Sequence, residues 1–356
     1  MTVIGARPQF IKAAPVSKAI RKYTTEILIH TGQHYDHNMS RIFFDDMGIP
    51  VPDANLEVGS GPHGQQTGLM LERIEDRLKE SVPDLVLVYG DTNSTLAGAL
   101  AAVKMEIPVC HIEAGLRSYN RKMPEEINRI LADRCADLLC CPTETAVRNL
   151  QAEGIKKNVY LTGDVMYDAA LHFRDIAVRQ SGIMKRLQLK EKEYVLCTLH
   201  RAENTDSVGR LTNIVNALID SEAVIVLPVH PRTEKMLLQS RLMERVKKNG
   251  HITMIPAISY LDMIRLEMSA GKIVTDSGGV QKEAYFFDIP CITLRDETEW
   301  TETVSDGWNC LAGARYEKIL DAIHSFHPVS KKYSHYGNGR AADIIAGHIA
   351  RFLSIT

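Results

Sequence analysis

Short apolar runs rich in Val, Ile and Leu alternate with longer amphipathic segments along the whole chain. The runs are continuous rather than alternating, which is typical of strands buried on both faces in parallel sheets. Amphipathic segments such as 93–104, 125–136 and 211–221 lie between them and predict helices. The resulting βαβ order predicts doubly wound α/β sheets. Strands are predicted at 3–4, 27–30, 85–89, 109–113, 138–141, 159–161, 194–198, 224–229, 252–255, 273–275, 291–294 and 309–311.

The pattern predicts two domains, because 356 residues exceed the size at which one core usually stops growing. The strand–helix rhythm breaks over 164–192, a charged helical segment without a strand signal. We therefore expect an N-terminal α/β domain at 1–168 with the acid–base groups, and a C-terminal α/β domain at 169–335. An amphipathic helix within 336–356 is expected to return to the first domain. A ligand cleft is expected between the carboxyl ends of the two sheets.

Composition narrows the classes of partner. The formal net charge of −2 gives no overall attraction to nucleic acid or to an anionic membrane, so neither partner is expected. No apolar run is long enough to span a bilayer, and no signal-peptide pattern is present. The seven cysteines form no Cys-x-x-Cys pair, which favours a reduced, cytoplasmic protein. Five of them lie in predicted strands, where a thiol acts as a small hydrophobe: Cys110, Cys140, Cys141, Cys197 and Cys291.

Polar residues recur directly after predicted strands, where the carboxyl ends of parallel strands face a ligand site. One Asp at such a place is typical of a helix N-cap. Charged residues after five separate strands instead favour a binding site. The segments concerned are 89–93, 111–117, 200–204, 230–232 and 276–279.

The segment 275–283, Thr-Asp-Ser-Gly-Gly-Val-Gln-Lys-Glu, follows a strand and opens a helix. Ser277 can cap that helix, while Gly278 and Gly279 let a phosphate approach the backbone N–H groups at its positive end. No Gly-Lys-Ser/Thr follows, so it is not a Walker loop. An ordinary glycine turn is the alternative, and the doubled glycine after Ser277 favours phosphate binding.

The segment 5–12, Gly-Ala-Arg-Pro-Gln-Phe-Ile-Lys, also joins a strand to a helix. Pro8 suits the first helical turn, which places Arg7 before the helix and Lys12 in its second turn. An arginine aimed into the cleft could clamp a diphosphate. Taken alone, a solvated arginine is the simpler interpretation.

Two other patterns are interpreted as loops. Gly-Ser-Gly-Pro-His-Gly at 59–64 matches the dinucleotide pattern, but it follows the polar stretch 53–57 rather than a buried strand. The histidines at 30–37 match no zinc spacing. No other cluster supplies four ligands, so no metal site is predicted.

Three carboxylates remain for chemistry: Asp91, Glu113 and Glu125. The first two end neighbouring predicted strands, and Glu125 follows Pro124 in the first turn of a helix. Carboxylates that converge near a phosphate site can divide proton removal and proton return between them. From these residues alone, the chain is predicted to be a nucleotide-sugar or nucleotide-phosphate enzyme that performs acid–base chemistry.

Seven co-linear motifs resemble one family, the non-hydrolysing UDP-N-acetylglucosamine 2-epimerases, over nearly the whole chain. They are Gly-Ala-Arg-Pro-Gln-Phe-Ile-Lys at 5–12, Gly-Asp-Thr-Asn at 90–93, His-Ile-Glu-Ala-Gly-Leu-Arg at 111–117, Pro-Glu-Glu-Ile-Asn-Arg at 124–129, Thr-Leu-His-Arg-Ala-Glu-Asn at 198–204, Asp-Ser-Gly-Gly-Val-Gln-Lys-Glu at 276–283 and Leu-Arg-Asp-Glu-Thr-Glu at 294–299.

The resemblance implies the two-domain glycosyltransferase-B architecture and isomerisation of a UDP-sugar through UDP elimination, a 2-acetamidoglucal intermediate and re-addition. It implies no metal and no nicotinamide cofactor, and it implies a homodimer that serves polysaccharide biosynthesis. It assigns Asp91, Glu113, Glu125 and His200 to the catalytic set, the histidine also holding the diphosphate. It assigns UDP binding to the set Arg7, Lys12, His230, Ser277, Gly278, Gly279, Glu283 and Arg295, with Glu283 on the ribose and Arg295 on the pyrophosphate side.

Three other functions stay open at this point. The sequences Ala-Arg-Pro-Gln-Phe and His-Pro-Arg-Thr also resemble those of the family branch that acts on UDP-2,3-diacetamido-2,3-dideoxyglucuronic acid. We prefer UDP-N-acetylglucosamine as the substrate, although the phosphate and uridine groups give identical signals in both. A retaining glycosyltransferase shares the architecture, and a non-catalytic nucleotide-sugar binder would leave C2 untouched.

Overall fold

The computed structural model describes residues 1–33, 50–330 and 332–355. The chain divides into two compact units. Unit 1 comprises residues 1–169 and 334–356, and unit 2 comprises residues 170–333. The helix α7, Val165–Gln180, starts in the first and ends in the second. Within the described residues, no helix is both long and apolar enough to cross a membrane.

Unit 1 is built on one sheet of seven parallel strands in the order β3-β2-β1-β4-β5-β6-β7. The order reverses between β1 and β4, which makes the carboxyl ends of these two strands the topological switch point. The strands are β1 (Thr2–Ile4), β2 (Leu28–His30), β3 (Ala54–Asn55), β4 (Val86–Tyr89), β5 (Val109–Ile112), β6 (Leu138–Cys141) and β7 (Val159–Leu161).

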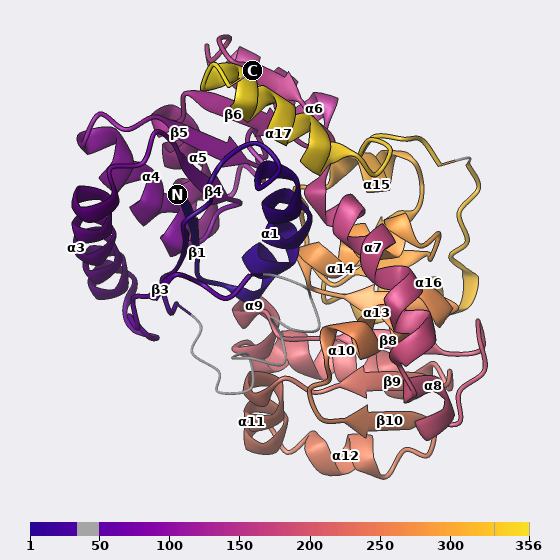
Figure 1. The fold of residues 1–356 in the computed structure, drawn as a ribbon. Helices are drawn as coiled ribbons and strands as arrows, with labels where there is room; N and C mark the ends of the chain where they lie inside the picture. Colours follow the sequence, from indigo (N-terminus) through magenta and orange to yellow (C-terminus); the bar gives the residue numbers. More distant parts are fainter. Residues whose placement is uncertain (34–49, 331, 356) are drawn as a thin grey trace. The chain divides into compact units, whose positions relative to one another are not determined.

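The helices of unit 1 connect these strands and cover the sheet (Figure 1). They are α1 (Arg7–Ile20), α3 (His63–Ser81), α4 (Asn93–Lys104), α5 (Pro124–Cys135), α6 (Glu144–Ala152) and α17 (Ala341–Phe352). The last of them, α17, packs on α1, so both ends of the chain belong to this unit (Figure 1). Asp168 accepts hydrogen bonds from the N–H groups of Ala341 (3.1 Å) and Ala342 (2.8 Å), which satisfies free donors in the first turn of α17.

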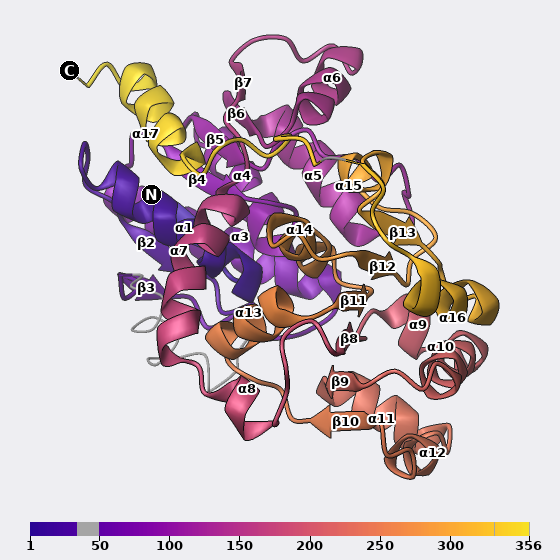
Figure 2. The same cartoon turned by 90° about the vertical axis from the view of Figure 1, so that its right-hand side faces the viewer.

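Unit 2 is also built on one parallel sheet, with six strands in the order β10-β9-β8-β11-β12-β13. These strands lie side by side in Figure 2. Its switch point lies between β8 and β11. The strands are β8 (Val195–Thr198), β9 (Ile225–Pro228), β10 (Ile252–Ile255), β11 (Lys272–Thr275), β12 (Cys291–Thr293) and β13 (Asn309–Leu311). The helices are α8 (Ile183–Arg186), α9 (Ala202–Thr205), α10 (Val208–Asp220), α11 (Pro231–Gln239), α12 (Met243–Lys247), α13 (Tyr260–Ser269), α14 (Gly278–Phe286), α15 (Thr301–Ser305) and α16 (Tyr316–Ser325).

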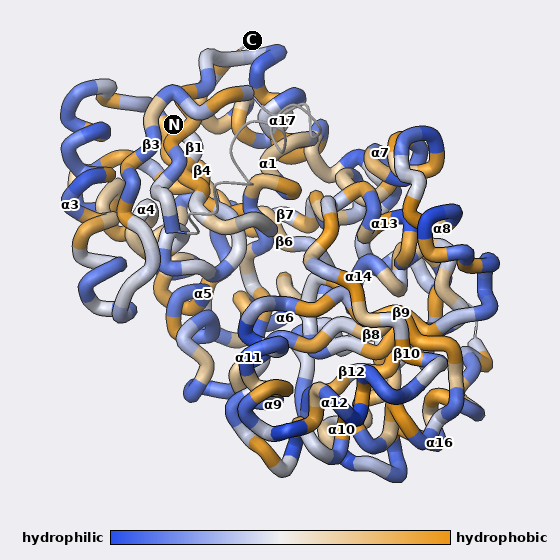
Figure 3. Tube along the Cα trace, turned by 90° about the horizontal axis from the view of Figure 1, so that it is seen from below, coloured by the Kyte–Doolittle hydropathy of each residue, from blue (hydrophilic) through white to orange (hydrophobic). Residues whose placement is uncertain are grey.

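The central strands of unit 2 are buried on both faces. Val226, Ile273 and Ile292 are fully shielded from solvent, and the segments of β9 and β10 are among the hydrophobic stretches in Figure 3. Full burial of each such side chain contributes about 1.5–3 kcal/mol. Continuous apolar runs therefore became parallel strands, and the predicted fold class, two doubly wound parallel sheets, is confirmed.

One strand was missed. The polar stretch 53–57 is not among the predicted strands, yet Ala54–Asn55 forms β3 at the edge of the unit 1 sheet. Its backbone pairs with β2, while Asn55 is exposed. An edge strand of two residues buries too little to need an apolar run. The interpretation of 59–64 as a loop holds for 59–62 only, because α3 begins at His63.

Candidate functional site

The turn after β1 is tied to the end of β4 by one side chain. Gln9 Oε1 accepts hydrogen bonds from the N–H groups of Gly5 (2.8 Å) and Ala6 (3.0 Å). Its Nε2 atom donates to the carbonyl oxygen of Tyr89 (2.8 Å). Arg7 is the first residue of α1, and its side chain lies outside the described part of the structure. The backbone of Arg7 therefore stands at the unit 1 switch point, as the strand order requires.

Asp91 follows β4 and is held by α5. Its carboxylate forms an ion pair with Arg129, whose Nη1 atom also donates to Glu126 (2.9 Å). Asn128 Nδ2 donates to the backbone carbonyl of Asp91 (3.0 Å). The Asp91 side chain keeps 32% of its surface exposed, whereas Arg129 and Glu126 are buried. The Asp91 carboxylate is thus accessible to solvent, while the oppositely charged residues behind it, Arg129 and Glu126, are buried.

Glu113 follows β5, the neighbour of β4, and the register Tyr89↔Ile112 brings the two strand ends level. The residue is buried and its φ of 72° lies in the left-handed region, which a non-glycine residue enters at a cost. Its Oε2 atom forms an ion pair with Nζ of Lys12 from α1. Strained backbone and a buried ion pair at one residue are typical of a functional position.

Gly90 leaves room for that ion pair. A Cβ atom on Gly90 would lie 3.1 Å from Glu113 Oε2 and 3.2 Å from Lys12 Nζ. Its φ of 63° also suits glycine. The Gly90-Asp91 turn and the Lys12–Glu113 pair therefore occupy one small volume at the carboxyl edge of the sheet.

Glu125 lies in the first turn of α5, one helical turn before Arg129. Residues i and i+4 share a helix face, so Glu125 stands on the side of α5 from which Arg129 reaches Asp91. Its side chain is half-buried. Unit 1 thus places Asp91 and Glu113 directly after the neighbouring strands β4 and β5, and Glu125 on the helix that holds Asp91 through Arg129.

In unit 2, a buried aspartate organises the switch point. The Asp276 carboxylate accepts hydrogen bonds from the N–H groups of His200 (3.1 Å) and Arg201 (3.0 Å) and from Nδ2 of Asn204 (3.2 Å). His200 Nδ1 lies 3.4 Å from the same carboxylate. These bonds join the turn after β8 to the turn after β11 and fix the imidazole of His200.

His230 follows the neighbouring strand, β9, and its ring centroid lies 5.8 Å from that of His200. Its Nδ1 atom accepts a hydrogen bond from the N–H of Arg232 (3.2 Å) and so caps α11. Burial lowers the pKa of His200 and that of His230 below the ordinary value of 6.5. Nearby cations lower both further, whereas Asp276 opposes the shift. The paired rings are therefore neutral near pH 7.

Ser277 caps α14 through its hydroxyl, which accepts from the N–H of Val280, and Gly278 and Gly279 form the first helical turn. A Cβ atom on Gly278 would lie 2.7 Å from Glu299 Oε1, whereas one on Gly279 would meet only Ser277 Oγ at 3.9 Å. The backbone at Gly279 is therefore open to an incoming group. A helix N-terminus with an open glycine can hold a phosphate.

Glu283 and Arg295 lie behind this turn rather than on an open surface. The hydroxyl of Tyr260 donates to Glu283 Oε1 (2.9 Å), and Arg295 Nη1 donates to Glu299 Oε2 (3.0 Å). Arg295 is only 3% exposed and Glu283 only 5%. Both predicted UDP contacts thus belong to a buried polar layer next to the glycine turn.

Supporting residues were not assigned roles from the sequence. Gln9, Arg129 and Asp276 each carry polar contacts that fix a predicted site residue, and each is buried. Asp276 was placed among the polar residues after strands, but its burial was not foreseen. The usable signal was a carboxylate directly after a predicted buried strand, since such a group finds several backbone donors there.

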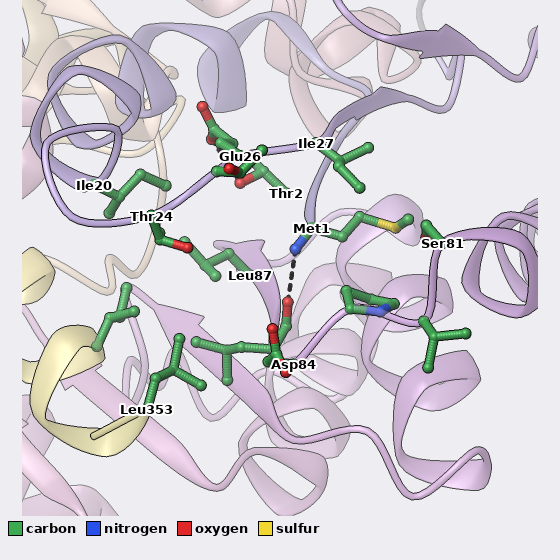
Figure 4. A pocket seen from close by; sticks show the side chains of 15 residues that line it. Met1, Thr2, Ile20, Thr24, Glu26, Ile27, Ser81, Asp84, Leu87 and Leu353 are labelled. Carbon is green, nitrogen blue, oxygen red and sulfur yellow. Dashed lines mark hydrogen bonds between the residues drawn. The ribbon is translucent and has the colours of Figure 1, made fainter. Parts of the chain in front are cut away.

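The structure also holds a cavity of about 290 Å³ in unit 1, shown in Figure 4. Its walls come from Met1 and Thr2 at the start of β1 and from Leu85 and Leu87 near the start of β4. These are the amino ends of the strands, opposite the edge that carries Asp91. Open α/β sheets bind ligands at the carboxyl ends, so this cavity is not the candidate site.

No cluster of three His, Cys, Asp or Glu side chains suited to a metal ion occurs among residues 1–33, 50–330 and 332–355. His34 and His37 of the histidine-rich segment lie outside the described residues. The predicted absence of a metal therefore stays a prediction. The five strand cysteines are buried, as predicted.

Two doubly wound parallel sheets, one with converging carboxylates and one with a phosphate-type helix N-terminus, define a nucleotide-sugar enzyme of the glycosyltransferase-B type. Residues 18–350 match the family model described as UDP-N-acetylglucosamine 2-epimerase. The chain belongs to this family and is a UDP-sugar 2-epimerase, an isomerase. The family predicted from the seven motifs is thereby confirmed.

Three relatives illustrate the match. A UDP-N-acetylglucosamine 2-epimerase homolog of Methanococcus maripaludis is 55% identical over 96% of each chain. The UDP-2,3-diacetamido-2,3-dideoxy-D-glucuronate 2-epimerase of Pseudomonas aeruginosa is 49% identical over 99% of each chain. The crystal structure of Methanocaldococcus jannaschii UDP-GlcNAc 2-epimerase in complex with UDP-GlcNAc and UDP is 43% identical, with a TM-score of 0.91 over 100% of this chain and 99% of that one.

Proposed function

We propose that this chain is a non-hydrolysing epimerase that interconverts UDP-N-acetylglucosamine and UDP-N-acetylmannosamine. The observation that carries the proposal is the grouping of Asp91, Glu113 and Glu125 at the carboxyl edge of the unit 1 sheet. The Methanocaldococcus jannaschii relative, whose fold matches over the whole chain, was crystallised with UDP-GlcNAc and UDP. The same ligands are therefore the first to be tested here.

The proposed chemistry uses the three carboxylates for proton transfer at C2. One carboxylate takes the C2 proton, the electron pair forms the C1–C2 double bond, and the C1–oxygen bond breaks to release UDP. The UDP oxygen then attacks C1 of the 2-acetamidoglucal, and a second carboxylic acid returns a proton to the opposite face of C2. Two groups with different environments can serve as base and acid in this way.

Unit 2 is proposed to hold UDP. The N–H groups around Ser277, Gly278 and Gly279 bind phosphate oxygens at the positive end of α14. His200 and His230 follow adjacent strands of the same sheet and add contacts to the diphosphate. Glu283 takes the ribose hydroxyls, and Arg295 supports the pyrophosphate from the buried layer. Arg7 and Lys12 of unit 1 complete the proposed set.

A second substrate is favoured by a specific observation. The Pseudomonas aeruginosa relative is named for UDP-2,3-diacetamido-2,3-dideoxy-D-glucuronate and is 49% identical, compared with 43% for the UDP-N-acetylglucosamine 2-epimerases of Methanocaldococcus jannaschii and Methanococcus maripaludis. The alternative proposal is therefore 2-epimerisation of this uronic acid. It uses the same bond changes at C1 and C2, and it differs in the groups that contact C3 and C6.

The deciding experiment is incubation with each UDP-sugar in D2O without added metal, followed by proton NMR. The main proposal requires the manno epimer of UDP-N-acetylglucosamine with deuterium at C2, and Glu113→Gln serves as the inactive control. Turnover of the diacetamido uronic acid alone would assign the chain to that branch. Sugar transfer to an acceptor without C2 exchange would indicate a glycosyltransferase.

We further propose a cytoplasmic homodimer, as the family resemblance implies. Size-exclusion chromatography with light scattering tests the dimer, because a dimer of this 39.8 kDa chain has twice that mass. A mass that stays at the monomer value over a wide range of protein concentration would contradict it.

A further inference from the structure

His111 lies in the middle of β5, is fully shielded from solvent and uses both ring nitrogens. Its Nε2 atom lies 2.7 Å from the carbonyl oxygen of Gly90, at the end of β4. Its Nδ1 atom lies 2.7 Å from Oδ1 of Asp133 in α5. One side chain thus links the three elements that carry Asp91, Glu113 and Glu125.

The carboxylate of Asp133 is surrounded by donors. It accepts hydrogen bonds from Arg117 Nη1 (2.7 Å) and from the N–H of Gly115 (3.2 Å), and Arg117 also pairs with Glu153 at 2.6 Å. A carboxylate that accepts hydrogen bonds from a guanidinium and a backbone N–H offers only acceptor oxygens. The ring nitrogen Nδ1 of His111 must therefore donate to it.

The second partner of His111 is also an acceptor only. A backbone carbonyl such as that of Gly90 has no proton to give, so Nε2 must carry one. A neutral imidazole has a single N–H and cannot satisfy both bonds. The protonation state of His111 therefore follows from its two acceptor partners.

We propose that His111 is a buried imidazolium that acts as a positioning residue for the carboxylates of the epimerase; this rests on the proposed function. It holds the Gly90 carbonyl, so it sets the direction of the turn that presents Asp91. The same residue anchors β5, and Glu113 directly follows this strand, two positions after His111. It also offsets part of the negative charge that the three carboxylates place at this edge.

The hydrogen bond between His111 and the Gly90 carbonyl affects the carboxylates because of where Gly90 lies. Gly90 has a φ of 63°, and the space beside its Cα holds the Lys12–Glu113 ion pair. A rotation of the Gly90 peptide would shift Asp91 and crowd that pair. Small displacements of a reacting group cost large factors in rate, on the order of a hundredfold for 1 Å.

Two variants separate charge from packing. His111→Gln keeps one amide donor but removes the charge and one of the two bonds. Asp133→Asn keeps an oxygen acceptor near Nδ1 and removes the counter-charge that holds the second ring proton. His348→Gln is the matched control, because His348 lies in the same unit, on α17, stacked on Tyr160 with ring centroids 3.9 Å apart.

We expect His111→Gln and Asp133→Asn to lower kcat by about tenfold to a hundredfold, with KM and UDP affinity within twofold of wild type. His348→Gln should leave all three unchanged. Loss of UDP affinity and kcat together, with a lowered melting temperature, would show a purely structural role and overturn the proposal. Unchanged kcat in His111→Gln would overturn it as well.

The charge is tested directly by NMR of the ring nitrogens in protein labelled with ¹⁵N-histidine, with His111→Gln used for assignment. Both His111 nitrogens should show the protonated signature in wild type at neutral pH, and one should lose it in Asp133→Asn. A neutral ring in wild type would overturn the proposal. This readout needs no turnover, so an inactive wild type would count against the proposed function and leave the charge measurement valid.

Discussion

Lys12 Nζ and Glu113 Oε2 form an ion pair with side chains only 11% and 5% exposed. Removal of one partner from such a pair leaves a buried charge without compensation. We expect Lys12→Met to lower the free energy of unfolding by about 3 kcal/mol and the double variant Lys12→Met/Glu113→Gln to recover part of that loss. Urea unfolding measures both.

The matched control for this prediction is Lys79→Met. Lys79 pairs with Glu75 on the surface of α3, with side chains 58% and 38% exposed. Exposed pairs contribute at most about 1 kcal/mol, so this variant should be nearly neutral. Equal losses in Lys12→Met and Lys79→Met would refute the buried-pair argument.

Proton transfer at C2 predicts the behaviour of the carboxylates. Asp91→Asn and Glu125→Gln should each lower kcat by about a hundredfold or more, while UDP binding measured by calorimetry changes little. Glu144→Gln is the control, because Glu144 also lies in the first turn of a helix but is exposed. Near-normal turnover in either site variant would remove that residue from the acid–base set.

The strands were predictable because the apolar runs of parallel strands are continuous. Every predicted run overlaps a strand of the structure, from Thr2–Ile4 to Asn309–Leu311. The exception, Ala54–Asn55, pairs through its backbone at a sheet edge. Backbone pairing has no side-chain signature, which is why the sequence pattern could not show it.

The sequence could predict the site residues that directly follow strands, but it could not predict which site residues are buried or what they contact. Asp91 and Glu113 could be found because they follow strands, since that position faces a ligand. The burial of Arg295 and Glu283 depends on contacts with Glu299 and Tyr260, which are four and twenty-three positions away in the chain. Such pairings arise from packing, which spacing alone does not encode.

The lowered pKa values of His200 and His230 predict a pH dependence of ligand binding. Both rings are neutral near pH 7, and a bound diphosphate favours their protonated forms. Affinity for UDP-N-acetylglucosamine should therefore rise as the pH falls from 7.5 through 6.5, with proton uptake on binding. Calorimetry in two buffers measures this uptake. His200→Gln should reduce the uptake, and an unchanged uptake would contradict the assignment.

The same shifts predict the opposite trend for stability without ligand. A histidine whose pKa is lower in the folded than in the unfolded state binds fewer protons when folded. Its contribution is fully present above the ordinary value of 6.5 and is lost as the pH falls through the lowered folded pKa. The free energy of unfolding should therefore decrease below pH 6.5, and less steeply in His200→Gln.

The two glycines after Ser277 should respond differently to a methyl group. A Cβ atom on Gly278 would lie 2.7 Å from Glu299 Oε1 and 3.4 Å from Trp300 Nε1, so Gly278→Ala must displace buried neighbours. We expect a lower melting temperature for that variant. A Cβ atom on Gly279 meets only Ser277 Oγ at 3.9 Å, so Gly279→Ala should unfold like wild type.

If a phosphate approaches this turn, Gly279→Ala should weaken UDP binding even though it leaves stability unchanged. The space that is open beside Gly279 in the free protein is then occupied by ligand, and the methyl group of Gly279→Ala intrudes on it. We expect UDP affinity to fall by about 1.5–3 kcal/mol, the range for a lost hydrogen bond to a charged group. Gly209→Ala is the control, because a Cβ atom on Gly209 also has open space around it, while Gly209 lies in the first turn of a different helix, α10. Wild-type UDP affinity in Gly279→Ala would exclude the N-terminus of α14 as the phosphate site, since a bound phosphate and the added methyl group cannot share that space.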